Sequence, residues 1–328
     1  MPAAGEFDLI ARYFKRPSPD RMLGVGDDCA LMPLSAGCEL AVSTDMLVEG
    51  RHFLPDADPA ALGHKALAVN LSDLAAMGAR PLACTLALSL PAVDHDWLAA
   101  FSEGFHALAR EAGCPLVGGD TTRSDAGVVL SITVLGEVRR SHALRRAAAR
   151  VGDDVWVSGS LGAADLALKL VLGQLPADPD RLRATRPALD RPEPRLELGR
   201  YLAGVAHAAI DISDGLLQDF GHILDASQCG AELWLDALPA HPALNGLDES
   251  LRRDAILAGG EAYELCFTAQ PLRREQIEAI GRQLNVPVTR VGTLVRGDRV
   301  HVLDRDGYPV RFGNRGFDHF SSPQEDEA

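Results

Sequence analysis

Apolar and polar residues in the first 140 positions alternate between the spacing of strands and the spacing of helices. Residues 39–44 alternate and then turn polar, as a strand does when it delivers side chains to a site at its end. The same reasoning predicts strands over 82–90, 116–117 and 128–138 and helices over 59–77 and 94–112. This succession lacks the regular strand–helix–strand repeat of a dinucleotide-binding fold, so we expect an α+β domain over 1–140.

A basic connector over 139–150 leads to a second predicted domain, 141–320, which begins with a strand over 154–158. Further strands are expected at 208–211, 231–235, 263–268, 288–295 and 299–303, with helices near 215–226 and 272–283. Residues 176–195 contain five prolines, which predicts an irregular surface loop inside this domain. The tail, 321–328, is polar and acidic and is typical of a disordered segment.

Length and composition agree with two soluble domains. The chain has 328 residues, of which 47% are apolar, enough for two cores at roughly 150 residues per domain. A net charge of −14 disfavours nucleic acid or an anionic membrane as a partner, since both require a basic face. The longest apolar stretch, 82–93, is too short to cross a bilayer, and the N-terminus lacks the pattern of a signal peptide. The six cysteines form no metal or disulfide spacing and are expected to be buried, which together indicates a cytoplasmic protein.

Six aspartates lie in short turns rich in glycine, serine and threonine, and these turns are scattered over two thirds of the chain. They are Asp28, Asp45, Asp73, Asp120, Asp211 and Asp214. If they converge, each close pair repels by about 4 kcal/mol at an effective dielectric of about 20, and divalent cations would relieve that repulsion. Carboxylate and hydroxyl oxygens with almost no histidine or cysteine suit Mg²⁺, which in such sites usually shares substrate phosphates. The pattern therefore predicts metal-dependent phosphate chemistry.

Each motif alone also has a simpler interpretation. The segment 24–28 (GVGDD) lacks the third glycine of a dinucleotide fingerprint and is as well explained by a hairpin turn. The segment 118–122 (GGDTT) follows a strand, where its glycines would let N–H groups approach phosphate, or it is an Asx-type turn. The segment 211–215 (DISDG) could bind metal or only cap a helix. The kinase-like triplet 219–221 (DFG) lies inside a helical pattern without its usual partners, and we interpret it as coincidence.

Three further side chains are ambiguous for the same reason. His52 could bind an anionic substrate or be an ordinary packing residue, and Arg146 could clamp a phosphate or be solvated. Glu261 lies at a tight glycine turn before a strand, where an ordinary loop carboxylate would look the same.

Taken together and in order, seven segments resemble the thiamine-monophosphate kinase family, over nearly the whole chain. They are 26–30 (GDDCA), 43–45 (STD), 65–81 (KALAVNLSDLAAMGARP), 118–123 (GGDTTR), 211–215 (DISDG), 259–267 (GGEAYELCF) and 316–320 (GFDHF). The family belongs to the superfamily of ATP-dependent aminoimidazole-ribonucleotide synthetases. The resemblance implies an N-terminal α/β domain that dimerises through its sheet into a shared β-barrel, and a C-terminal α/β domain that completes the active-site cleft. It implies transfer of a phosphoryl group from ATP to thiamine monophosphate, giving thiamine diphosphate.

The resemblance also implies roles for individual residues. Several Mg²⁺ ions around the ATP phosphates would be held by Asp28, Ser43, Thr44, Asp45, Asp73, Asp120, Asp211 and Asp214. Gly119, Asp120, Arg146 and Ser213 match positions that contact the nucleotide, and His52, Glu261 and Phe317 match positions that hold thiamine monophosphate. Asp45, Asp73 and Asp120 are the expected catalytic residues. Ala262 stands where relatives often have aspartate, which puts one secondary polar contact in doubt.

The expected chemistry needs no general base, because the acceptor phosphate oxygen is already anionic and the barrier comes from bringing two polyanions together. Related enzymes of the superfamily are the nearest alternatives. A selenophosphate synthetase needs a reactive cysteine before residue 24 and a hydrogenase-maturation protein needs a C-terminal cysteine, and this sequence has neither. An aminoimidazole-ribonucleotide synthetase is disfavoured by the segments 260–265 and 316–320. A regulatory protein that binds divalent ions without turnover is the alternative outside enzymes.

Overall fold

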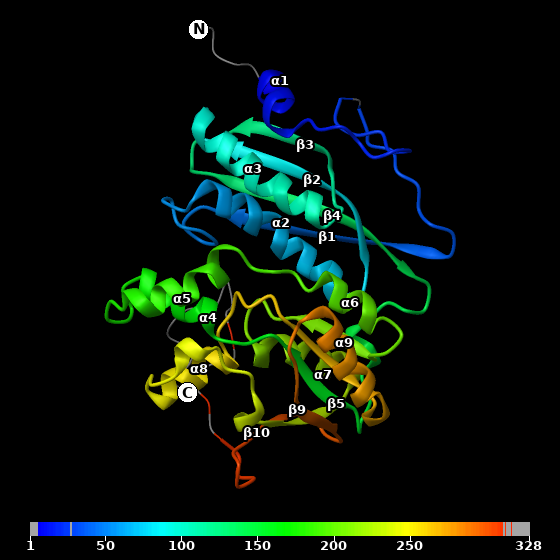
Figure 1. Cartoon of the computed structure of the whole chain (residues 1–328), viewed down its shortest axis with the longest axis vertical. Helices are drawn as coiled ribbons and strands as arrows, with labels where there is room; N and C mark the ends of the chain where they lie inside the picture. The colour runs from blue at the N-terminus through cyan, green and yellow to red at the C-terminus, as the bar shows by residue number, and fades with distance from the viewer. Residues whose placement is uncertain (1–5, 27, 311, 313–315, 317–328) are drawn as a thin grey trace. The chain divides into compact units, whose positions relative to one another are not determined.

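The computed structural model describes residues 6–26, 28–310, 312 and 316, and the chain divides into two compact units. The first unit comprises Met1–Leu74 and Ala79–Ser141. The second comprises Ala75–Gly78 and His142–Ala328. Each unit combines helices with a sheet, as the sequence pattern predicts (Figure 1). Both sheets contain parallel and antiparallel pairs.

The first unit is built on a four-stranded sheet. Its strands are β1 (Cys38–Val48), β2 (Arg80–Leu90), β3 (Leu116–Arg123) and β4 (Val129–Arg139), in the spatial order β1-β4-β2-β3. The β1/β4 and β4/β2 pairs are antiparallel and the β2/β3 pair is parallel. The sheet is open, so β1 and β3 are its two edges.

Helices α2 (Pro59–Ala76) and α3 (His95–Glu111) cover one face of this sheet (Figure 1). Asp94 caps α3 by accepting hydrogen bonds from the backbone N–H groups of residues 96 and 97. The two helices approach closely because each contributes a glycine at the contact. A Cβ added at Gly63 would lie 2.1 Å from the carbonyl oxygen of Phe101, and one added at Gly104 would lie 1.9 Å from that of Ala60.

A short N-terminal segment, α1 (Glu6–Leu9) followed by the π-helix η1 (Ile10–Phe14), packs on α3. The backbone carbonyl of Tyr13 accepts from the hydroxyl of Ser102 and lies 3.2 Å from Nε2 of His106. Burial lowers the pKa of His106 to about 4, and the nearby Arg16 charge acts in the same direction. A neutral imidazole is therefore the form that holds this segment in place.

The second unit is built on a six-stranded sheet. Its strands are β5 (Asp154–Ser158), β6 (Ala208–Asp211), β7 (Gly230–Trp234), β8 (Leu265–Ala269), β9 (Val288–Val295) and β10 (Val300–Leu303), in the order β10-β7-β9-β5-β8-β6. Only the β10/β7 pair is parallel among these strands. Apolar cores lie on both faces, and β5 and β8 are accordingly buried along their whole length.

The two faces of this sheet form separate cores. On β5, Val155 and Val157 face a core that includes Phe220 of α7 (Leu216–Ser227). Trp156, between those valines, faces a second core with residues of α6 (Leu196–Leu202) and α9 (Arg274–Leu284). Alternation along one strand thus assigns neighbouring side chains to opposite layers.

The prediction that 176–195 forms no regular element is wrong, because α5 (Pro179–Asp190) lies there. Asp178 caps the helix and Pro179 occupies its first turn, where the missing N–H has no cost. Pro187 lies inside the helix near its end, and the buried Leu189 packs with α4 (Ala163–Val171). Two of the five prolines therefore belong to a helix and not to a loop. Helix α6 and helix α8 (Glu249–Leu257) were also not expected from the pattern.

The prediction that the cysteines are buried holds for four of the six. Cys29 is exposed and Cys38 is half-buried, and none of the six forms a disulfide. Among the described residues, none of the helices combines the length and the apolar character that a bilayer-crossing segment requires.

Candidate functional site

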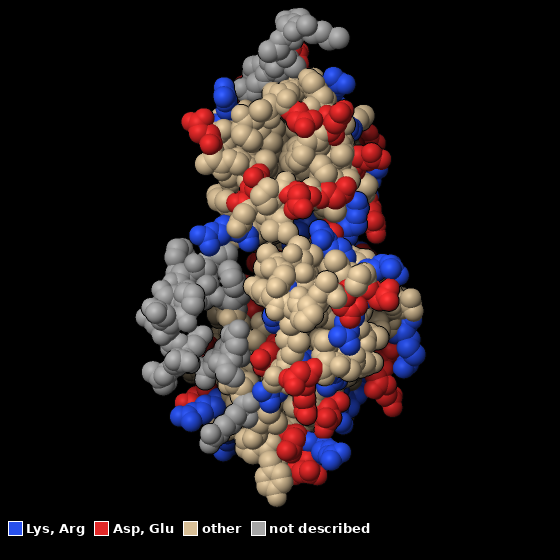
Figure 2. All heavy atoms as spheres, turned by 90° about the vertical axis from the view of Figure 1, so that its left-hand side faces the viewer, with Lys and Arg blue, Asp and Glu red and all other residues tan. Residues whose placement is uncertain are grey.

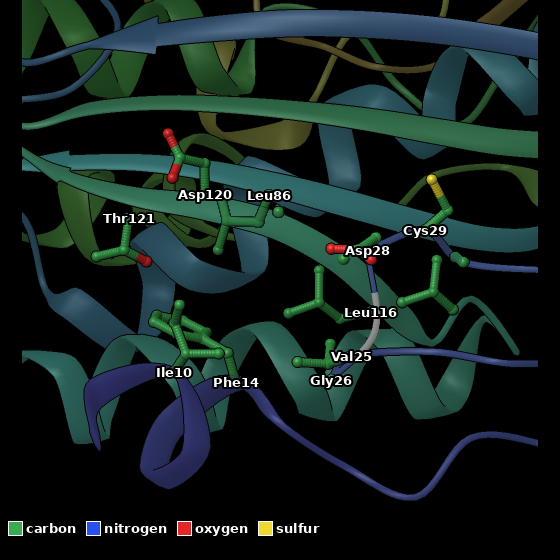
Figure 3. A pocket seen from close by; sticks show the side chains of 14 residues that line it. Ile10, Phe14, Val25, Gly26, Asp28, Cys29, Leu86, Leu116, Asp120 and Thr121 are labelled. Atoms are coloured by element: carbon green, nitrogen blue, oxygen red, sulfur yellow. The ribbon is translucent and has the colours of Figure 1, made fainter. Parts of the chain in front are cut away.

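A cavity of about 520 Å³ in the first unit brings together two of the predicted motifs. The antiparallel bridge between Leu23 and Leu31 closes the loop that carries Asp28, so the hairpin interpretation of that segment describes its backbone correctly. Yet Gly26 and Asp28 line the same cavity as residues 118–121 of β3 (Figure 3). Apolar side chains from η1, the loop and the strands, including Ile10, Phe14, Val25 and Leu116, line the rest of the cavity.

At Gly119 the backbone of β3 lies too close to β2 to leave room for a side chain. The segment 118–122, for which an Asx-type turn is one of the two interpretations from sequence, continues β3 to Arg123. It follows a register shift opposite residues 84 and 85 of β2. Gly119 pairs with Leu86 and has φ +154°, and a Cβ there would lie 1.9 Å from the Leu86 carbonyl oxygen. Glycine is therefore required for β3 to pair with β2 while presenting Asp120 to the cavity.

A second group of predicted residues meets where β1 passes α2. The Ser43 hydroxyl donates to Oδ2 of Asp73 at 2.5 Å, and the backbone N–H of Asp45 donates to Oδ1 of Asn70 at 2.9 Å. Asn70 is fully buried and donates its own amide to the carbonyl of residue 66, 3.0 Å away. Two pairs of residues, Ser43 with Asp73 and Asp45 with Asn70, are thus held together by hydrogen bonds between β1 and α2.

The register of the sheet separates the remaining carboxylates of the first unit. Asp45 pairs with Ile132 and Asp120 with Ala87, on the two edge strands, with two strands between them. Asp45 shares its face with the buried Leu47, whereas Asp120 shares the opposite face with Ala87. The sequence did not reveal this separation, because pairing register is a tertiary property.

Thr44 points away from Ser43 and Asp45 because successive side chains on a strand alternate. Its hydroxyl donates to the Ile132 carbonyl at 2.9 Å and accepts from Thr133 at 3.1 Å. The Thr44 hydroxyl is therefore bound to β4 and does not face the side chains of Ser43 and Asp45.

In the second unit, residues 211–215 form the turn from β6 into α7, as predicted. The backbone N–H groups of Ser213, Asp214 and Gly215 all donate to Oδ2 of Asp219, at 2.9, 3.0 and 3.1 Å. Burial raises the pKa of Asp219 to about 7; the three N–H donors oppose the rise, and the charge of Asp214 adds to it. The Gln218 amide lies 3.4 Å from Oδ2 of Asp214.

The segment 259–264 lies directly against this turn. The N–H of Glu261 donates to the Ser213 carbonyl at 2.7 Å, and the N–H of Tyr263 donates to the Ile212 carbonyl at 2.8 Å. Glu261 has φ +64° and Tyr263 φ +49°, a strained conformation for both residues that concentrates at functional sites. The structure therefore brings Glu261 beside the predicted metal-binding turn.

The buried side chain of Glu264 holds the 259–264 segment in place. Its carboxylate accepts two hydrogen bonds from Arg195, at 2.7 Å from Nε and 2.5 Å from Nη2, and a third from Ser158. Gly159 is needed beside it, since a Cβ there would lie 1.8 Å from Oε1 of Glu264. A charge-assisted bidentate pair of this kind fixes geometry as well as charge.

The three remaining predicted site residues are His52, Arg146 and Phe317. Nδ1 of His52 accepts from the Val48 N–H at 3.1 Å, which leaves Nε2 as the protonated nitrogen of the neutral ring. Arg146 is exposed, and its carbonyl accepts from Ser227 at the far end of α7, about 18 Å along the helix from the 211–215 turn. Phe317 lies outside the described residues.

Among the described residues, no three acidic, histidine or cysteine side chains are close enough to hold a metal by themselves. Four of the six aspartates belong to the first unit and two to the second. The single cluster expected from sequence is therefore not formed within either unit.

Sequence reasoning missed three residues that organise these segments: Asn70, Asp219 and Glu264. The pattern does place Asn70 on the same helix face as Asp73, three residues before it, but gives no sign that its amide binds the backbone of β1. Asp219 belongs to a DFG triplet that the sequence pattern interprets as coincidence, and Glu264 carries no signal beyond lying near a glycine turn.

Comparison with known proteins gives a consistent result along the chain. Residues 26–138 match the family described as AIR synthase related protein, N-terminal domain, and residues 150–305 match AIR synthase related protein, C-terminal domain. The thiamine-monophosphate kinase of Salmonella typhimurium is 46% identical over 98% of this chain and 100% of its own length.

Solved structures show the same relationship. The crystal structure of thiamine-monophosphate kinase from Stenotrophomonas maltophilia K279a superposes with a TM-score of 0.82 at 46% identity, covering 89% of this chain and 93% of its own. A structure of AaThiL complexed with AMPPCP and TMP superposes with a TM-score of 0.76 at 30% identity, covering 88% and 89%. The matches of both domains and the 46% identity over nearly the full length show that this chain belongs to the thiamine-monophosphate kinase family of AIR synthase related proteins.

Proposed function

We propose that this protein phosphorylates thiamine monophosphate with ATP, giving ADP and thiamine diphosphate, the last step of thiamine diphosphate synthesis. The observation that carries the proposal is the pairing of Glu261, which matches a substrate-binding position, with Ser213, which matches a nucleotide-binding position. This pairing occurs in a chain related to such kinases over its full length, including one complexed with an ATP analogue and TMP.

The cavity of the first unit supports nucleotide binding. Its apolar lining suits a flat base, and the backbone of Gly118 and Gly119 leaves room for phosphate beside Asp28 and Asp120. Ser213 contacts the nucleotide through its hydroxyl, because its N–H already donates to Asp219. Arg146 supplies a positive charge from the connector.

The donor set of the chain fits Mg²⁺. Every proposed ligand offers hard oxygen, and the short Ser43–Asp73 contact shows two such oxygens already facing one another. The proposed ligands are Asp28, Ser43, Thr44, Asp45, Asp73, Asp120, Asp211 and Asp214. When bound, Mg²⁺ offsets the charge that ATP, thiamine monophosphate and the protein share. That charge is substantial, since the chain carries −14 and acidic side chains are spread over the face shown in Figure 2.

The protein's own residues act mainly by positioning. His52, Glu261 and Phe317 hold thiamine monophosphate so that an anionic phosphate oxygen faces the γ-phosphorus of ATP in line with the leaving ADP. Asp45, Asp73 and Asp120 would hold Mg²⁺ that offsets the charge of the transferred phosphate, with Asp45 and Asp120 on separate ions because they lie on opposite faces of the first sheet. Asp28 and Asp211 would contribute to Mg²⁺ that offsets the charge of the acceptor. The transfer is direct, without a phosphoenzyme.

A single assay tests this function. Purified protein is incubated with Mg-ATP and thiamine monophosphate, and thiamine diphosphate is measured by chromatography, with selenide and formylglycinamidine ribonucleotide as control acceptors. We expect product from thiamine monophosphate only, and no labelled protein when γ-labelled ATP is supplied alone. Product from a control acceptor only, or no turnover with any of them, would refute the assignment.

We further propose that the protein is a homodimer whose two open sheets close into a shared barrel, in the cytoplasm. On the uncovered face of β1, Val42 is 57% and Met46 58% exposed, and Leu40 lies on the same face. A second copy is the occupant whose apolar surface matches this face. The domain over 1–140 would then both dimerise and hold nucleotide, and that over 141–320 would complete the cleft.

The double substitution Val42→Asp and Met46→Asp tests the dimer. We expect light scattering to give a dimer for the wild type and a monomer for this variant. The control is Leu272→Asp, at an apolar residue of the second unit that is 92% exposed, and it should remain dimeric. A wild-type monomer at micromolar concentration, or a dimeric double variant, would refute this surface.

A further inference from the structure

The turn 211–215 uses nearly all of its backbone polar groups inside the protein. Three consecutive N–H groups converge on one oxygen of Asp219, at 2.9 to 3.1 Å. On the other side, the carbonyls of Ile212 and Ser213 accept from Tyr263 and Glu261. The turn is therefore held from two directions, and little of its backbone is left to move.

Consecutive N–H groups at the start of a helix form a site that usually binds an anion such as phosphate. Here the anion is internal, because Asp219 lies in the first turn of α7 and its side chain folds back to the helix start. Asp219 is only 3% exposed. The turn consequently cannot offer these N–H groups to a nucleotide and presents its side chains instead.

The glycines around the turn show how closely this arrangement is packed. A Cβ at Gly215 would lie 2.7 Å from the Ala258 carbonyl oxygen, and one at Gly260 would lie 2.6 Å from that of Ser213. Gly316 also lies against the turn, where a Cβ would be 2.9 Å from the Asp214 carbonyl oxygen. A shift of the turn would therefore displace several segments together.

We propose that Asp219 is a positioning residue for the phosphoryl transfer. Its carboxylate takes the place of a phosphate at the start of α7 and fixes the turn so that Asp211, Ser213 and Asp214 face the Mg-nucleotide. The inference rests on the proposed function for the identity of that ligand. Asp219 itself touches neither substrate, and the DFG triplet that contains it owes its aspartate to this task.

Two substitutions of similar size separate the contribution of the Asp219 charge from that of its acceptor oxygen. Asp219→Asn keeps an acceptor oxygen and loses the charge, whereas Asp219→Leu removes the acceptor altogether. The matched control is Asp225→Asn, which removes one negative charge from an exposed position of the same helix. Each protein is first examined by amide hydrogen exchange of residues 211–218 without ligand, and then by the Mg²⁺ concentration that gives half-maximal activity at saturating ATP and thiamine monophosphate.

We expect exchange in this segment to be about 10-fold faster or more in Asp219→Leu and only a few-fold faster in Asp219→Asn, because a charged acceptor bond is roughly twice as strong as a neutral one. We expect the half-maximal Mg²⁺ concentration to rise about 10-fold or more in the leucine variant, with a lower kcat, and to rise about 3-fold in the asparagine variant. Asp225→Asn should match the wild type.

If the leucine variant does not fold, the asparagine variant decides the question. Wild-type exchange and wild-type Mg²⁺ dependence in a folded Asp219→Asn or Asp219→Leu protein would overturn the proposal. A failure of the proposed function can be distinguished from a failure of this inference. If the wild-type protein shows no turnover, the amide exchange of the variants still shows whether Asp219 holds the turn.

Discussion

Replacing Gly119 by alanine tests the link between strand pairing and the nucleotide cavity. The added Cβ would lie 1.9 Å from the Leu86 carbonyl oxygen, 2.8 Å from its carbon and 3.1 Å from the Leu86 nitrogen. Since real Cβ contacts essentially never fall below 3.0 Å, either β3 must move away from β2 or the pairing must break at this position.

The expected loss of stability is the sum of two energetic costs. Overpacking against backbone that cannot rotate away costs about 1–3 kcal/mol. Holding alanine at a φ of +154° adds about 1 kcal/mol. We therefore expect the free energy of unfolding to fall by about 2–4 kcal/mol, a large part of a typical 5–15 kcal/mol. Asp120 is the next residue, and a displacement of about 1 Å there should lower turnover by roughly 100-fold.

The control lies at the adjacent glycine. A Cβ at Gly118 would meet only the methyl carbon of Thr85, at 3.7 Å, which is ordinary contact. Urea unfolding and steady-state formation of thiamine diphosphate are measured for both variants. We expect the stability of Gly118→Ala to remain within about 1 kcal/mol of the wild type, so this variant is the control for the steric cost at Gly119. A Gly119→Ala protein with wild-type stability and turnover would show that β3 does not pair with β2 in this register.

Three further outcomes are expected. Asp120→Asn should lower turnover by about 100-fold or more while leaving the urea midpoint nearly unchanged, since Asp120 is exposed; unaltered turnover would contradict its role. Arg195→Met should lower the free energy of unfolding by about 3 kcal/mol because it leaves the Glu264 carboxylate buried without its bidentate partner, whereas the exposed Arg200→Met should cost less than about 1 kcal/mol. His106 has a pKa of about 4 when folded and 6.5 when unfolded, so the unfolded chain binds the extra proton between these values. Stability should consequently fall by about 3 kcal/mol from pH 6.5 to pH 4, and this loss should be absent from His106→Gln.

The sequence by itself determined most elements and the family. Periodicity of apolar residues is a local property, so it placed α2, α3 and most strands of both sheets within a few residues. The exception is β3, which continues six residues beyond the predicted 116–117. The motifs were recognisable because a turn that holds carboxylates or approaches phosphate needs particular residues at fixed spacing. Where the pattern failed, as at α5, the cause was also local, since Pro179 starts a helix there instead of preventing one.

Only the tertiary structure decided what those motifs do to one another. Pairing register placed Asp45 and Asp120 on opposite faces of the first sheet, and it sent the Thr44 hydroxyl away from Ser43. The contact between 211–215 and 259–264, and the support of both by Asp219 and Glu264, depend on residues separated in sequence by up to 106 positions. Such contacts are set by the packing of whole strands and helices, and no short stretch of residues encodes them.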